Sequence, residues 1–156
     1  MSITFETERC RIRPFEENDI ADFMSYRNNL EWMQFQGFKG KKYLEYKAAL
    51  LKQPNFNEGV QLAVVNKKTG ELIGDLYLKI EKSICWIGYT IAPEYARQGF
   101  AFEVVTQLLQ QLQQAGLTLA KAGVEQENTA SIQLLKKLGF EQIGAEGTEL
   151  IFQHDL

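Results

Sequence analysis

The sequence predicts a mixed α/β protein in which one mostly antiparallel sheet of six to seven strands is flanked by about four helices. Short runs rich in β-branched and aromatic residues alternate with tight turns between residues 60 and 91, as in an antiparallel meander. The hydrophobic period changes from two to about 3.6 after Gly99, and a strand-like run returns at residue 117. The order β-α-α-β-β-β-α-β-α-β-β predicts one sheet covered by helices.

Composition limits the possible functions. The 156 residues, 45% apolar and 24% charged, fit a single domain over residues 1–156. A net charge of -3 argues against a nucleic-acid partner held by bulk charge. The N-terminus lacks a signal-peptide pattern, and no apolar run approaches the roughly 20 residues of a membrane span. Two cysteines and one histidine favour a reducing, cytoplasmic setting and almost exclude a structural zinc site.

The first half predicts a strand over residues 3–13 that is irregular near Thr7 and ends at Pro14. Asn18 or Asp19 can cap a helix with apolar positions at helical spacing, and a second helix is expected over residues 41–52. Three strands then follow, over residues 60–66, 71–80 and 84–91.

The second half predicts a long helix from Gly99 to Gly116, where glycine is a natural C-terminal stop. Its core-facing stripe consists of Ala101, Val104, Val105, Leu108, Leu109 and Leu112. A strand over residues 117–124, a helix capped by Asn128 and ending at Gly139, and strands over residues 140–144 and 149–152 complete the chain.

The loop from residue 91 to residue 101 is the most informative segment. It joins a buried strand to the long helix, and the small residues Gly99 and Ala101 would let a bulky anion approach the backbone. The first amides of a helix lack intrahelical partners and carry the positive end of its dipole, which suits a pyrophosphate. Arg97 can add a charge-assisted contact. The alternative is an ordinary strand–helix corner in which Gly99 only relieves crowding.

Asn128 and Ser131 lie three residues apart at the start of the next helix. The simplest interpretation of Asn128 is a helix N-cap. Ser131 is either an exposed helix serine or a hydroxyl that donates to a ligand emerging from the sheet.

Together, these segments resemble the GNAT superfamily of acyl-coenzyme A-dependent N-acetyltransferases. The phosphate loop of that family has the pattern Gln/Arg-x-x-Gly-x-Gly/Ala, which falls here on residues 96–101, with Ala96 in the Gln/Arg place. The opening run Thr7-Glu8-Arg9-Cys10-Arg11-Ile12-Arg13-Pro14-Phe15 resembles the ribosomal-protein N-terminal acetyltransferase (RimJ/RimL-like) branch. The same branch is matched by Tyr26-Arg27-Asn28, Ile87-Gly88-Tyr89, Glu103 and the run from Asn128 through Ser131 to Leu138-Gly139-Phe140.

The resemblance implies that the fourth strand (87–91) and the fifth strand (119–124) splay apart around the pantetheine arm of acetyl-coenzyme A. Backbone groups near Tyr89, Ile91 and Ala92 would hold that arm and the thioester carbonyl. The pyrophosphate would be bound by the N–H groups of Arg97, Gln98, Gly99, Phe100 and Ala101. No metal is needed, and the protein is expected to be a monomer or a homodimer.

Asn128 would contact the pantetheine, and Ser131 would protonate the leaving thiolate. Leu135 stands where many relatives have a tyrosine for that task, so Ser131 is the catalytic candidate. Trp32 and Trp86 are the candidates for contact with the acceptor. Trp86 also stands where many relatives carry a glutamate base, so the base is unassigned, with a water relay or Glu149 as suggestions.

The expected reaction is direct attack of an amine on the thioester. Deprotonating a lysine amine at neutral pH costs roughly 4 kcal/mol, against less than about 1 kcal/mol for a peptide α-amine, so a missing base favours a peptide or protein N-terminus as acceptor. A small amine, such as a polyamine or an aminoglycoside, is an alternative acceptor. A binding module that holds acyl-coenzyme A without turnover is the alternative from another class.

Overall fold

The computed structural model describes residues 4–156 and contains the predicted elements in the predicted order. The strands are β1 (Phe5–Glu6), β2 (Cys10–Pro14), β3 (Val60–Asn66), β4 (Leu72–Glu81), β5 (Ile84–Ile91), β6 (Leu119–Glu125), β7 (Glu141–Glu146) and β8 (Glu149–Asp155). The helices are α1 (Ile20–Arg27), α2 (Tyr43–Leu50), α3 (Phe100–Gln114) and α4 (Thr129–Lys137). Single 3₁₀ turns, Glu17–Asp19 and Pro93–Tyr95, precede α1 and α3.

The described chain forms an eight-stranded sheet, one strand more than the predicted upper limit. The difference arises at Thr7, where the sequence predicts an irregularity. The Thr7 amide donates to the Cys10 carbonyl at 2.9 Å, so the chain turns back and β1 pairs antiparallel with β2. The first predicted strand is therefore two, and its expected first residue, Ile3, lies outside the described residues.

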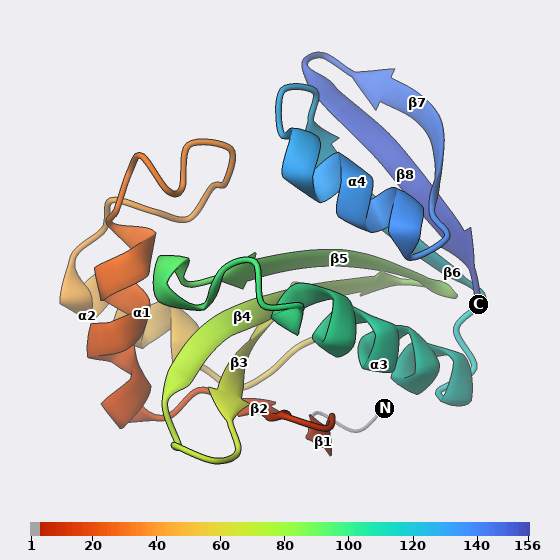
Figure 1. Ribbon diagram of the computed structural model, residues 1–156. Helices are drawn as coiled ribbons and strands as arrows, with labels where there is room; N and C mark the ends of the chain where they lie inside the picture. The colour runs from red at the N-terminus through yellow and green to blue at the C-terminus, as the bar shows by residue number, and fades with distance from the viewer. Residues whose placement is uncertain (1–3) are drawn as a thin grey trace.

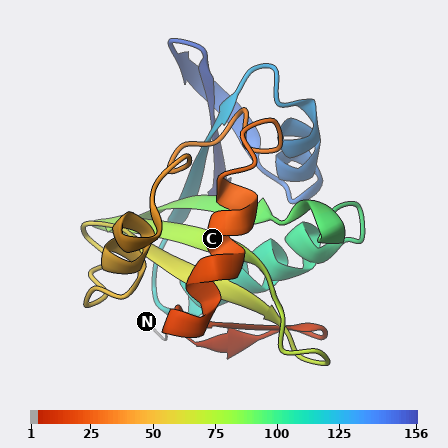
Figure 2. The same cartoon turned by 90° about the vertical axis from the view of Figure 1, so that its left-hand side faces the viewer.

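The strand order is β1-β2-β3-β4-β5-β6-β8-β7, and every neighbouring pair is antiparallel except β5 and β6. Each face of the sheet carries its own core. Alternate residues of β3 and β4 pack with α3 on one face, while Ala63, Val65 and Leu72 pack with α1 and α2 on the other. Figure 2 shows α3 and α4 on one side of the sheet and α2 on the opposite side.

The parallel pair β5 and β6 is joined over only part of its length. Pairing is confined to Ile84–Leu119, Cys85–Ala120 and Trp86–Lys121, at the beginning of both strands. Beyond Trp86, β5 stays paired with β4 to residue 91, and β6 stays paired with β8 to residue 125. The two strands therefore diverge, as the family resemblance implied, and Figure 1 shows α4, β7 and β8 standing away from β3, β4 and β5. No helix within residues 4–156 is long and apolar enough to cross a membrane.

Candidate active site

The turn before α3 presents a row of unpaired backbone amides. Within residues 4–156, no hydrogen-bond acceptor is found for the N–H groups of residues 97–101. Arg97 (φ 61°) and Gly99 (φ 81°) both adopt the left-handed conformation, which makes consecutive amides converge into an anion-binding concavity. A side chain at Gly99 would be strained by that φ angle. Arg97 lies in the left-handed region without glycine's freedom, which is typical of functional loops.

The segment between β1 and β2 contacts the first turn of α3. Glu103 accepts hydrogen bonds from the Thr7 hydroxyl (2.5 Å), the Arg9 amide (2.8 Å) and the Arg9 Nε (2.6 Å). The Arg9 guanidinium also lies 4.0 Å from the centre of the Phe100 ring. Partial burial raises the pKa of Glu103, but these hydrogen bonds outweigh it and hold the pKa below its ordinary value. These contacts bring together three residues of the family pattern that are far apart in the sequence, Thr7, Arg9 and Glu103.

A cavity of about 710 Å³ extends from this turn into the gap beyond β5, and we call it cavity A. Nine of the predicted site residues line it, namely Trp32, Tyr89, Ile91, Arg97, Gly99, Phe100, Ala101, Asn128 and Ser131. Gln98 contributes its unpaired amide to the turn, but its side chain is exposed and donates to the Glu94 carbonyl at 3.2 Å. The fold therefore brings together predicted site residues of β5, α3 and α4 that are distant along the chain.

The backbone of β5 exposes alternate residues to the gap. The Ala92 amide donates to the Ile73 carbonyl on β4 at 2.8 Å, so the N–H and C=O groups of Tyr89 and Ile91 point the other way. The Ile91 carbonyl accepts from the Trp32 indole Nε1 at 2.9 Å. Ala92 does not fit its expected role, because it is buried and its carbonyl is also used, accepting from the Tyr95 amide.

Ser131 meets a tyrosine hydroxyl at the wall of cavity A. The Tyr89 hydroxyl and Ser131 Oγ lie 2.7 Å apart, and Asn128 caps α4 by accepting from the Ser131 amide at 3.3 Å. Burial raises the pKa of Tyr89 to about 12, so its hydroxyl is protonated at neutral pH. Leu135, in the family's tyrosine place, is buried in the core. The tyrosine beside Ser131 therefore comes from β5 and not from α4.

Neither cysteine is placed as a nucleophile. Cys10 and Cys85 are both fully buried, and burial raises the pKa of Cys10 to about 11 and that of Cys85 to about 12. A thiol reacts as its thiolate, which these environments disfavour. Within residues 4–156, no three His, Cys, Asp or Glu side chains cluster as a metal site requires.

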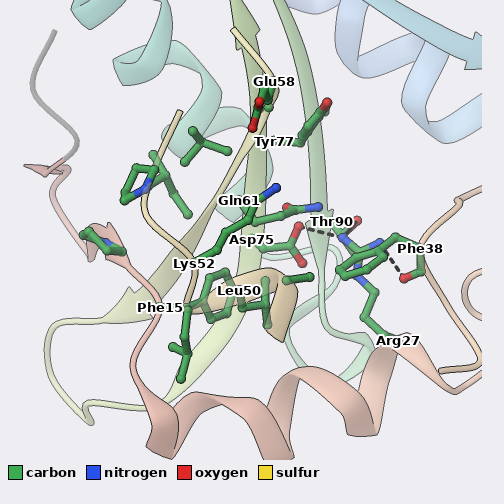
Figure 3. Close-up of a pocket in the computed structure, with 18 of the residues that line it drawn as sticks. Phe15, Arg27, Phe38, Leu50, Lys52, Glu58, Gln61, Asp75, Tyr77 and Thr90 are labelled. Atoms are coloured by element: carbon green, nitrogen blue, oxygen red, sulfur yellow. Dashed lines mark hydrogen bonds and ion pairs between the residues drawn. The ribbon is translucent and has the colours of Figure 1, made fainter. Parts of the chain in front are cut away.

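A second cavity, of about 580 Å³, lies on the other face of the sheet, and we call it cavity B. Figure 3 shows Glu58 and Tyr77 toward one end of it, and Arg27 and Phe38 toward the other. Much of its wall is apolar, formed by Pro14, Phe15, Phe38, Leu50, Leu51, Pro54 and Tyr77. Gln36, Tyr89 and Thr90 line both cavities, so the two spaces lie next to each other along the second half of β5.

A buried ion pair forms one end of cavity B. Arg27 donates to Asp75 at 2.6 Å and to the Thr90 hydroxyl at 3.3 Å, and the Tyr26 hydroxyl donates to the other Asp75 oxygen at 2.5 Å. Burial raises the pKa of Asp75, while the Arg27 charge opposes that shift. Sequence reasoning named Arg27 only as part of a pattern and missed Asp75. A lone aspartate in an otherwise apolar strand was the available signal, because such a carboxylate needs a buried partner.

The three remaining candidates lie in different places. Trp32, predicted to contact the acceptor, lines cavity A. Trp86 lines neither cavity and lies beside Lys121, whose Nζ is 5.7 Å from the ring centre. Glu149, the suggested base, lies over Gly123 on β6 and also lines neither cavity. The general base therefore stays unassigned.

Comparison with known proteins agrees with this geometry. Residues 9–141 match the family model described as the acetyltransferase (GNAT) domain. The uncharacterized N-acetyltransferase YoaA of Bacillus subtilis is 28% identical over 147 residues, which cover 89% of this chain and 83% of YoaA.

Two solved structures share the fold at low sequence identity. RimL, a ribosomal L7/L12 α-N-protein acetyltransferase solved with coenzyme A, superposes with a TM-score of 0.85 at 14% identity, covering 98% of each chain. The spermidine N-acetyltransferase of Vibrio cholerae, solved with coenzyme A and spermine, superposes with a TM-score of 0.79 at 19% identity, covering 95% of each chain. At such identities the likeness establishes the fold and not the acceptor.

Proposed function

The chain belongs to the GNAT acetyltransferase family, and on that premise we propose that it moves the acetyl group of acetyl-coenzyme A to a peptide or protein N-terminal α-amine. GNAT enzymes use acetyl-coenzyme A and an amine acceptor. The observation that carries the proposal is that cavities A and B, on opposite faces of the sheet, share Tyr89 and Thr90 as lining residues. Two substrates that enter from opposite faces of the sheet can react only where such spaces join.

Cavity A is proposed to hold acetyl-coenzyme A. The unpaired amides of residues 97–101, at the start of a 15-residue helix, suit the pyrophosphate. The gap beyond Trp86 leaves the Tyr89 backbone free to bind an extended chain as a neighbouring strand would. Ala96 lacks the side-chain contact that the family pattern supplies, so main-chain groups carry most of the recognition.

Ser131 is proposed to protonate the departing thiolate. The Tyr89 hydroxyl, 2.7 Å away, would donate to Ser131 Oγ and leave the serine proton free to point into cavity A. The Ser131 hydroxyl is a weaker acid than Tyr89, whose pKa is about 12, so Ser131 can give its proton to the thiolate sulfur only as it takes one back from the Tyr89 hydroxyl. The proton that the acceptor amine releases returns to Tyr89 through solvent, so Tyr89 both orients Ser131 and acts through it.

The charge of cavity B supports an acceptor with a single amine. Its charged lining residues are Arg27 and Lys52 against Glu58 and Asp75, and Arg27 and Asp75 pair with each other. A polyamine carries several positive charges that need several carboxylates, whereas a peptide α-amine with a pKa near 8 is easily neutralised without a strong base. The apolar wall would pack against the first side chain of the peptide.

A small amine is the second candidate acceptor, favoured by the structural likeness to the spermidine N-acetyltransferase of Vibrio cholerae. Release of free thiol from acetyl-coenzyme A, measured with peptides of varied first residue beside polyamines and aminoglycosides, separates the candidates. We expect the highest kcat/KM on peptides, with mass spectrometry locating the acetyl group on the α-amine. Faster turnover of polyamines would overturn the peptide assignment, and saturable coenzyme binding without thiol release would indicate a non-catalytic binding module.

A further inference from the structure

The connection between α1 and α2, residues 28–42, separates the two cavities. Residues 31–36 of this segment line cavity A, while residues 36–38 line cavity B. Its conformation therefore affects both spaces. The segment contains no regular helix or strand, so its position depends on side-chain contacts from the body of the protein.

Arg27 supplies a buried polar contact to this segment, beside the apolar packing of Met33 and Phe38. Its guanidinium donates to the Gly37 carbonyl at 3.0 Å while it also donates to Asp75 on β4 and to Thr90 on β5. One side chain thus ties the segment to the two strands that form the floor of cavity B. The planar, forked guanidinium makes all three bonds at once, which the single ammonium group of lysine cannot reproduce in the same directions.

This arrangement contributes little to the stability of the fold. Arg27 is only 4% exposed and Asp75 only 1%, and Arg27 Nε is buried with no hydrogen-bond partner among the described residues. A buried ion pair generally gains little over apolar residues of similar volume, and an unpaired buried N–H adds a further penalty. A role in geometry explains why such a pair stands at the end of cavity B.

We propose that Arg27 is a positioning residue for acetyl transfer. By holding Gly37 against Asp75 and Thr90, it fixes the wall between cavity A and cavity B, so that the acceptor amine reaches β5 at Thr90 beside the thioester. The inference rests on the proposed function for the reaction, but the contacts that carry it lie on the acceptor side. Binding of the coenzyme, which depends on residues 97–101, does not require Arg27.

The test compares Arg27→Lys and Arg27→Met with Arg13→Met as a matched control. Arg13 makes a comparable bond to Asp19, at 2.7 Å, and lines neither cavity. Three quantities are measured for each variant: the acceptor KM and kcat, the affinity for coenzyme A by calorimetry, and amide hydrogen exchange within residues 28–42.

For Arg27→Lys, we expect an acceptor KM raised by about 10-fold, coenzyme affinity within about twofold of wild type, and exchange in residues 28–42 faster by about 10-fold. Arg27→Met should show larger changes in the same direction, and Arg13→Met should show none of the three. An unchanged acceptor KM in Arg27→Lys, or an equal loss of coenzyme affinity, would overturn the inference. If the wild-type protein releases no thiol with any amine, the proposed function fails, and unchanged exchange in residues 28–42 of Arg27→Lys would then reject the positioning role.

Discussion

Cavities A and B lie against the same strand, β5, but are built from different parts of the chain. The part of cavity A that suits a pyrophosphate consists of backbone amides at residues 97–101, backed by small residues. Cavity B is lined by residues from β2, α1, α2, β3, β4, β5, the 28–42 segment and the loop between α2 and β3. A surface made of backbone tolerates many sequences so long as the chain keeps its path, whereas a surface made of side chains changes with each substitution. We therefore expect the proposed coenzyme side to be shared among proteins of this fold, and the proposed acceptor side to be particular to this protein.

The largest effect is expected where a substitution disturbs the backbone site itself. Gly99→Glu places a strained side chain and a negative charge beside the amides of residues 97–101, and coenzyme affinity measured by calorimetry should fall by at least about 100-fold. Gly70→Glu is the matched control, because Gly70 also has a positive φ (75°) but lies in the turn between β3 and β4. Equal affinities in Gly99→Glu and wild type would contradict the assignment of cavity A.

Substitutions of the hydroxyl pair Tyr89 and Ser131 test whether side chains contribute to catalysis within cavity A. Ser131→Ala should lower kcat by about 100-fold with little change in coenzyme affinity, and Tyr89→Phe should lower it by about 10-fold. Because Tyr89 is assigned to act through Ser131, adding Tyr89→Phe to Ser131→Ala should cause little further loss. Ser83→Ala removes a hydroxyl from a remote pair with Thr118 and serves as control. Multiplicative losses in the double variant would refute the orienting role of Tyr89.

Filling cavity B tests the acceptor side alone. Gly88 lies on the floor of this cavity, where an added Cβ would sit 3.4 Å from Tyr77 Cβ. Gly88→Leu should raise the acceptor KM by roughly 10-fold while coenzyme affinity stays within about twofold. Gly144→Leu, on the exposed strand β7, is the control because nothing lies near its would-be Cβ. A parallel loss of both affinities would show that the two cavities are not separable.

The smallest expected effect concerns the support beneath the amide turn. Because the folded-state pKa of Glu103 is lowered, its contribution to stability is present above the unfolded pKa of about 4.3 and is lost as the pH falls through the folded value. Glu103→Gln should reduce the free energy of unfolding by about 1–2 kcal/mol at pH 7, and the difference from wild type should shrink below about pH 4. Denaturant titration at both pH values measures it. Glu81→Gln, in an exposed pair with Lys79, should have almost no effect, and a pH-independent deficit in Glu103→Gln would contradict the assignment.

Periodicity predicted most of the fold because each element here agrees with its local pattern. The α3 stripe from Val104 to Leu112 is buried as expected, and the irregularity at Thr7 was visible although its consequence, an extra strand, was not. The splay after Trp86 came from the family resemblance. Periodicity could not have predicted it, since β5 and β6 read as ordinary strands and the gap is a property of their pairing.

How much of the candidate site the sequence could predict differs between cavity A and cavity B. Gly99, Ala101, Asn128 and Ser131 could be named from the sequence because helix starts and small residues follow local rules. Asp75 and cavity B could not, because their surroundings depend on contacts across more than 40 residues of chain, such as Arg27 to Asp75. Trp32 and Trp86 were assigned to the acceptor from their places in the family pattern, and such a place does not say which cavity a side chain enters.

The three residue pairs at the start of β5 and β6 have a consequence for how the molecule responds to its ligand. Within the described chain, these three pairs are the whole ladder between the part of the sheet from β1 to β5 and the part from β6 to β8. A chain-like molecule lying in the gap would supply cross-links that the polypeptide omits, and the C-terminal segment should resist proteases better when it is bound. Because β5 and β6 pair over only part of their length, a molecule bound between them is expected to hold the two parts of the sheet together. The enzyme should therefore be most rigid when its substrate is bound.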